Sequence, residues 1–216
     1  MKHFVKVFAA IALASGAAPA FAADAGVVAP RPAAPAAAPA IRNVLSLEFG
    51  PEFAEATRNL ADVYGKASLA YTFANGWIWT GTFQDTYKAN AANEQQQLIE
   101  TTLGYNFKLD PTFTLTTSAG VGYEFDSNPA NKPSQNYGYY VLNAGLNVKL
   151  SSQWTWNAIS ARYRDAFSGG WATPKVSTGL TYTIDAKDSV YANVGYSWKN
   201  GVADKIGIAV GYKYGF

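Results

Sequence analysis

From Val44 onward the sequence alternates between apolar residues and small or polar residues. Between 113 and 125 the odd positions are Phe, Leu, Thr, Ala, Val, Tyr and Phe, whereas the even positions are Thr, Ser, Gly and Glu. The same period of two recurs at 140–150, 176–184 and 190–198. A period of two is typical of β-strands with one apolar face. The pattern therefore predicts strands, and no helix-length apolar run occurs after residue 22.

The alternating segments predict ten strands, at about 44–53, 64–74, 77–87, 96–109, 112–125, 138–150, 154–165, 174–184, 189–198 and 205–216. Short breaks alternate with longer ones at 54–63, 88–95, 126–137, 166–173 and 199–204. Asn75-Gly76 predicts a type I′ hairpin turn. Trp154 and Trp156 are out of phase with Ile159, which predicts a β-bulge in the seventh strand. Eight strands is the alternative if the first hairpin is wrongly assigned.

The predicted fold class is all-β, an antiparallel up-and-down transmembrane β-barrel. The strands are long enough to cross a bilayer when tilted, and short periplasmic turns would alternate with longer outer loops. A soluble β-sandwich also alternates, but it needs charges on its water-facing side, where this chain has mostly Gly, Ser, Thr and Asn. Two aromatic girdles are expected: Phe73, Trp77, Trp79, Phe107, Phe113, Tyr212 and Tyr214 at the periplasmic side, and Phe53, Tyr87, Tyr123, Phe125, Tyr140, Tyr163, Tyr196 and Trp198 at the outer side.

Two further segments precede the barrel, which we place at 43–216. Residues 1–22 have the features of a signal peptide: Lys2 and Lys6, then an apolar stretch too short to span a bilayer, then Ala20-Phe21-Ala22 as the cleavage site. Residues 23–42 are rich in Ala and Pro and predict a disordered periplasmic linker. In a polyproline II conformation such a spacer would reach roughly 60 Å.

Composition excludes several classes of function. The net charge is +2, and without Lys2 and Lys6 of the leader it is near zero, so nucleic acid is not an expected partner. The chain has no Cys and only one His, in the leader, so the usual activated nucleophiles cannot be assembled. We expect no enzyme, no cofactor and no metal site. A paired-carboxylate site from Glu48, Glu100 and Glu124 is the one catalytic arrangement that the residue types allow.

The alternation places nine charged side chains on the predicted lumen face: Glu48, Lys66, Glu100, Glu124, Arg162, Arg164, Lys175, Lys205 and Lys213. Basic residues outnumber acidic ones, so an open lumen would favour anions. Salt bridges filling a closed barrel are the alternative, because side chains nearly fill so small a barrel. Inward glycines argue for free space: Gly104, Gly120, Gly122, Gly145, Gly179 and Gly195.

The chain ends with apolar residues at every second position, Ile208, Val210, Tyr212 and Tyr214, followed by Phe216. This segment resembles the C-terminal targeting strand of small Gram-negative outer-membrane β-barrel proteins, which ends in Phe and is read by the barrel-assembly machinery. The resemblance implies a location in the outer membrane, in contact with its lipid and lipopolysaccharide.

The predicted mature start, Ala23-Asp24-Ala25, is similar to that of certain proteobacterial barrels. In that group the N-terminal amine is cross-linked to peptidoglycan, which implies attachment at Ala23. The linker contains no Lys whose amine could compete.

We therefore expect a non-enzymatic outer-membrane β-barrel with a structural role in the cell envelope, and we hypothesise that it tethers the membrane to peptidoglycan. The alternative is a narrow porin-like channel for small solutes, weakly favouring anions. Adhesion through the loops has little in the sequence to favour it.

Overall fold

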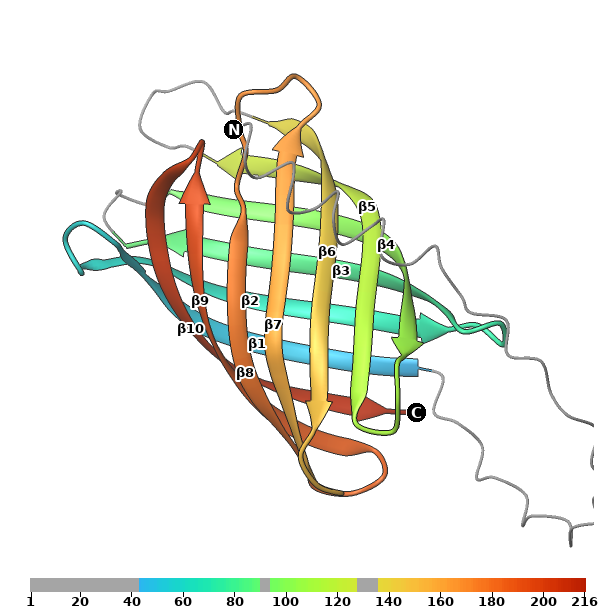
Figure 1. Cartoon of the computed structure of the whole chain (residues 1–216). Coiled ribbons are helices and arrows are strands. Elements are labelled where there is room, and N and C mark those ends of the chain that lie inside the picture. Colours follow the sequence, from blue (N-terminus) through green and yellow to red (C-terminus); the bar gives the residue numbers. More distant parts are fainter. Residues whose placement is uncertain (1–42, 90–93, 128–135) are drawn as a thin grey trace, which may run out of the picture. The chain divides into compact units, whose positions relative to one another are not determined.

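The computed structural model describes residues 43–89, 94–127 and 136–216, which form a closed antiparallel β-barrel (Figure 1). Its ten strands are β1 Asn43–Ala54, β2 Leu60–Thr72, β3 Trp77–Lys88, β4 Gln95–Lys108, β5 Phe113–Ser127, β6 Tyr137–Lys149, β7 Trp154–Ala166, β8 Lys175–Thr183, β9 Asp188–Lys199 and β10 Val202–Gly215. Each strand pairs with the next in the chain, and β10 pairs with β1. The prediction of ten strands is therefore confirmed, and the alternative of eight strands is wrong. The predicted leader 1–22, the linker 23–42 and Ala23 lie outside the described residues.

The strands have the length that a bilayer requires. A strand of 12 residues such as β1 reaches about 40 Å, or about 30 Å along the barrel axis at a tilt of about 40°. That is about the thickness of the hydrocarbon core. In the described part of the chain, no helix is long and apolar enough to cross a membrane.

One end of the barrel, here called the terminus end, carries the start of β1, the end of β10 and four connections of four residues each. In each connection a side-chain oxygen accepts hydrogen bonds from backbone N–H groups two or three residues later. These acceptors are Asn75, Asp110, Ser151 and Asp185. Such local bonds favour a tight turn over continued sheet. The N–H groups of Lys187 and Asp188 also lower the pKa of the exposed Asp185 carboxyl.

At the opposite end, here called the loop end, the connection between β9 and β10 differs from the sequence prediction. Residues 199–204 were expected to form a longer loop, but β9 and β10 continue to a two-residue turn at Asn200-Gly201, with φ of 50° and 84°. Two positive φ values are the mark of a type I′ turn. The prediction of that turn at Asn75-Gly76 was wrong. Only Gly76 has a positive φ there, and its N–H donates to Phe73 O at 3.0 Å.

The predicted bulge in the seventh strand is confirmed. Leu146 of β6 pairs with Ile159, but the next residue, Asn147, pairs with Asn157, so Ala158 has no partner in this ladder. The extra residue reverses the alternation. Trp154, Trp156 and Ile159 therefore all face outward, at 43%, 42% and 51% exposure.

The barrel is apolar on its outside and polar within. Large apolar side chains along the outward faces of the strands are about half exposed, for example Phe49 at 57%, Ile99 at 54% and Ile208 at 50%. The buried side chains, by contrast, include the charged Glu124 and Arg164. A continuous apolar surface of this extent needs lipid to cover it. Exposed aromatic residues lie near both rims, with Trp77 and Phe113 at the terminus end and Tyr87 and Phe125 at the loop end.

Candidate functional site

The lumen brings together the charged side chains that the alternation assigned to it. Six of the nine line one central cavity: Glu48, Lys66, Glu100, Arg162, Arg164 and Lys175. Glu124 and Lys205 line a second, smaller cavity nearer the loop end. The Nζ of Lys213 lies 4.8 Å from the centre of the inward-facing Tyr191 ring. The lumen is therefore the place where the polar chemistry of this chain is concentrated.

Glu48 is at the centre of a cluster that joins β1, β2 and β9. Its Oε1 lies 2.6 Å from Lys66 Nζ and accepts a hydrogen bond from Tyr64 OH at 3.1 Å. Its Oε2 accepts a hydrogen bond from Tyr191 OH at 3.0 Å. Both carboxylate oxygens of Glu48 therefore have donors. A carboxylate inside a protein is stable in its ionised form only when such donors are present.

Glu100 and Arg164 form a buried ion pair between β4 and β7, which are separated by two strands. Both Arg164 Nε, at 2.9 Å, and a terminal guanidinium nitrogen, at 2.8 Å, donate to Glu100 Oε2. Tyr139 OH donates to the same oxygen at 3.3 Å, and the guanidinium also lies over the Tyr139 ring at 5.2 Å. The Glu100–Arg164 pair therefore crosses the lumen instead of lying along its wall, and we call such a crossing ion pair a chord.

A second chord joins β1 to β8, where Lys175 Nζ lies 2.9 Å from Glu52 Oε1. Lys205 contacts both Glu52, at 3.7 Å, and Asp62. Sequence reasoning missed Glu52 and Asp62. Glu52 is in phase with Glu48, and this spacing could have revealed it. Asp62 was assigned to a loop because β2 begins at Leu60, four residues earlier than the pattern indicated.

Near the loop end, Glu124 is held by donors from two neighbouring strands. Tyr137 OH donates to its Oε1 at 2.6 Å, and Gln96 donates to the same oxygen. Trp171, from the connection between β7 and β8, packs on the Tyr137 ring with 4.5 Å between centroids and lines the smaller cavity. An aromatic side chain that the sequence placed in an outer loop thus lines the lumen.

The inward glycines do not leave the free space that the sequence suggested. A Cβ at Gly122 would lie 2.3 Å from Cζ of Tyr139, and one at Gly179 would lie 2.0 Å from Oδ1 of Asn193. At Gly195 the nearest atom is Cε of Lys175, at 2.9 Å. Because these glycines have no side chain, the side chains of Tyr139, Asn193 and Lys175 can lie against the lumen wall. The expected empty space is therefore absent at Gly122 and Gly179, whereas Gly195 does line the central cavity.

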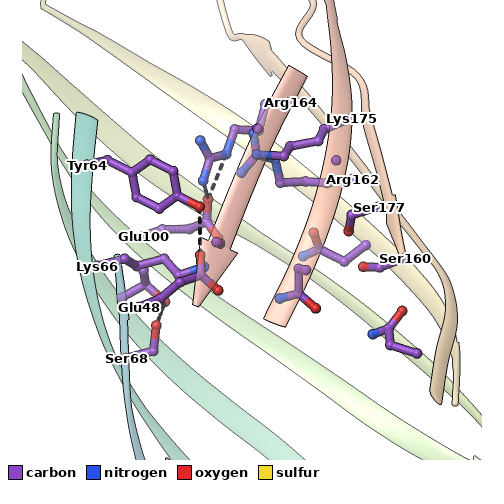
Figure 2. A pocket seen from close by; sticks show the side chains of 17 residues that line it. Glu48, Tyr64, Lys66, Ser68, Glu100, Ser160, Arg162, Arg164, Lys175 and Ser177 are labelled. Carbon is purple, nitrogen blue, oxygen red and sulfur yellow. Dashed lines mark hydrogen bonds and ion pairs between the residues drawn. The ribbon is translucent and has the colours of Figure 1, made fainter. Parts of the chain in front are cut away.

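The central cavity has a volume of about 260 Å³ and a predominantly polar wall (Figure 2). Besides the six charged residues it is lined by Asn143, Asn157, Ser160, Ser177 and Asn193, among others. The wall opposite Lys66 and Ser68 carries Ser160 and Ser177. Arg162 also points into this cavity. Its Nε is enclosed and has no hydrogen-bond partner within the described residues.

The carboxylates do not form the paired arrangement that acid–base hydrolysis requires. Glu48, Glu100 and Glu124 each contact a separate set of donors, supplied by Lys66, Arg164 and Tyr137 respectively. Among the residues described here, no three His, Cys, Asp or Glu side chains are grouped as metal ligands would be. What the site offers chemically is charge and hydrogen bonding in an enclosed polar space.

The lipid-facing surface and the polar lumen together define a transmembrane β-barrel of the outer-membrane type. The chain is similar in fold to the NanC porin, at 10% identity and a TM-score of 0.47, with 78% of this chain and 98% of that chain covered. It is also similar to the KdgM porin, at 14% identity and a TM-score of 0.43, covering 79% and 99%. A third similar structure is the β domain of the Bordetella autotransporter BrkA, at 10% identity and a TM-score of 0.48, covering 82% and 100%. At these identities the likeness concerns the fold alone.

No protein-family model matches the sequence, and no curated protein matches it either. The lumen of this chain must therefore be interpreted from its own residues.

Proposed function

We propose that this chain is a non-enzymatic outer-membrane barrel with a structural role in the cell envelope, and that its lumen is closed to through-flow. The observation that carries the proposal is the set of ion pairs crossing the lumen between strands that are not neighbours. Glu52–Lys175 joins β1 to β8, and Glu100–Arg164 joins β4 to β7. A solute passing along the axis would have to break them.

Opening the lumen would cost free energy. Breaking the buried Glu100–Arg164 pair leaves charge without a partner in a region of low dielectric, at a cost of about 3–5 kcal/mol. Tyr139 and Trp171 fill the space beside the Glu100 pair, with 6.1 Å between their ring centroids. A barrel of this size has little room left once such side chains are in place.

Planar-bilayer recording of the purified barrel tests the closure. The wild type should give no stable conductance steps. Glu52→Ser with Lys175→Ser removes one chord and should produce small steps, whereas Glu55→Ser with Arg58→Ser, an exposed pair 3.4 Å apart, should not. Steady conductance of the wild-type barrel would contradict a closed lumen.

The second candidate is the narrow channel, and one observation favours it. Four basic and two acidic side chains line the central cavity, so a permeating ion would meet a net positive field. If the wild type conducts, Arg162→Glu should lower its preference for anions, as measured by the reversal potential in a salt gradient. An unchanged reversal potential would exclude Arg162 from the permeation path.

The tether extends the structural proposal to the predicted mature N-terminus. It is supported by the Ala23-Asp24-Ala25 start, by the Pro-rich spacer and by the lack of Lys between 23 and 41. Sacculi boiled in detergent and digested with a muramidase should yield a peptide beginning at Ala23 with a muropeptide on its α-amine. A free amine on that peptide in every preparation would contradict attachment. Deleting residues 25–40 should leave the barrel folded while weakening the envelope.

A further inference from the structure

Within the described residues, Arg162 is the basic group of the central cavity whose Nε is enclosed without a hydrogen-bond partner. It takes part in none of the ion pairs formed between described side chains. The other basic groups that line the cavity each contact a carboxylate: Lys66–Glu48 at 2.6 Å, Arg164–Glu100 at 2.8 Å and Lys175–Glu52 at 2.9 Å.

The neighbouring carboxylates cannot serve Arg162 without losing existing bonds. Glu52 and Glu100 are near enough for their charges to act on it, but Glu100 Oε2 already accepts from Arg164 and Tyr139. Glu52 lies between two lysines. Arg164, on the same face of β7, adds a second positive charge beside Arg162. The local field therefore favours an additional anion.

The guanidinium group defines which anion would fit. It is planar and presents its N–H donors in a fork that matches a carboxylate or a phosphate. The half-buried Arg162 has lost the hydration of its Nε without gaining an acceptor there, which makes binding of such an anion more favourable than at an exposed arginine.

Below Arg162, towards the terminus end, the inner wall presents hydroxyl and amide groups in two rows. Ser160 pairs with Ser177 in one row. In the next row, Gly179 lies between Asn157 and Asn193. Oδ1 of Asn157 is also enclosed without a partner in the described residues. Amides and hydroxyls both donate and accept hydrogen bonds, so they suit the hydroxyl groups of a ligand.

We propose that the cavity beside Arg162 is a binding site for a small polyhydroxy carboxylate, with the carboxylate on Arg162 and the hydroxyls along the Ser and Asn rows. The volume of about 260 Å³ is slightly below the range of drug-sized pockets, about 300–1,000 Å³. A sugar acid of six carbons is therefore the upper size that we assign to it.

The site does not require a conducting barrel. Asn143, which pairs with Arg162, also lines a cavity of about 210 Å³ whose wall includes Ile78, Thr80 and Asn106. These residues lie towards the terminus end, whereas the chords and Trp171 lie towards the loop end. A ligand could enter from the terminus end and leave the same way. Binding is therefore separable from the closure proposed above.

Isothermal titration of the detergent-solubilised full barrel tests the site, with gluconate and its neutral counterpart glucitol as probes at constant ionic strength. Gluconate should bind and glucitol should bind at least tenfold more weakly, since only the former carries the carboxylate. Arg162→Met should weaken gluconate binding by about tenfold or more. Arg58→Met, the same change at an exposed arginine, should leave it unchanged.

Three results would overturn the proposal: equal binding of gluconate and glucitol, no loss on Arg162→Met, or sulfate binding as tightly as gluconate. The last would show a simple anion site with no use for the Ser and Asn rows. The shift of the folded band on an unheated gel verifies that each variant is a barrel. If Arg162→Met fails to fold, Arg162→Lys keeps the charge without the fork and should still weaken gluconate binding severalfold.

Discussion

The Glu100–Arg164 pair offers a direct test of how the lumen is held together. Glu100→Gln keeps the shape of the side chain but removes the charge on which Arg164 Nε and its terminal nitrogen, together with Tyr139 OH, converge. Arg164 is 6% exposed, so water cannot replace the lost partner. We expect the variant to fold into a less stable barrel.

The expected loss of unfolding free energy in Glu100→Gln follows from the distance between the two charges and from their burial. At the separation of 2.8 Å two unit charges attract by about 6 kcal/mol at an effective dielectric of about 20. The glutamine oxygen still accepts neutral hydrogen bonds, so the net loss should be about 3 kcal/mol, at the low end of what breaking a buried pair costs. The double variant Glu100→Gln with Arg164→Met leaves no unpaired charge and should recover most of that loss.

Urea unfolding in lipid vesicles, followed by tryptophan fluorescence, measures these differences. The matched control is Glu55→Gln, which breaks the exposed pair with Arg58 at 3.4 Å and should cost less than about 0.5 kcal/mol. Equal stability of Glu100→Gln and Glu55→Gln would refute the reasoning. A double variant less stable than Glu100→Gln alone would show that Arg164 acts through contacts other than its carboxylate partner.

Three further substitutions test the lipid-facing surface, the lumen wall and the turn at Asp185 of the terminus end. Phe83→Arg places a charge in the middle of the lipid-facing strand β3 and should cost about 2–4 kcal/mol, against about 0–1 for Tyr87→Arg near the rim, both by vesicle unfolding. Gly122→Val puts a Cβ 2.3 Å from a tyrosine ring and should cost about 1–3 kcal/mol, whereas Gly65→Val has open space and should cost little. Asp185→Asn should lower the unfolding midpoint near neutral pH. Because the folded pKa of Asp185 is depressed, this difference should vanish as the pH falls through it, below about 4.

The strands were predictable because lipid imposes a strict period of two on every residue that crosses it. The same regularity located the bulge, since Trp154 and Ile159 cannot both face lipid without an extra residue between them. The turn at Asn200-Gly201 was misjudged because Lys199 and Asp204, which flank it, interrupt the apolar alternation on either side. Strand ends that project beyond the membrane lose the signal that marks strands within it.

The lumen was predictable as a set of residues but not as a set of contacts. Alternation places Glu100 and Arg164 on the same inner surface, yet nothing in a linear sequence indicates that they meet across two intervening strands. That depends on the tilt and the stagger of the barrel. The glycines were misinterpreted for the same reason: Gly122 faces Tyr139 only through the register between β5 and β6.

Strand β10 is bonded on both of its edges, to β9 and to β1, and its seam with β1 runs from Val44 opposite Gly215 to Ala54 opposite Lys205. Before that seam forms, β1 and β10 each expose a row of unsatisfied backbone groups that hydrocarbon would not tolerate. A factor that bound β10 along this edge would occupy the backbone groups that β1 bonds in the closed barrel. Closure of the barrel would then require β1 to displace that factor from β10.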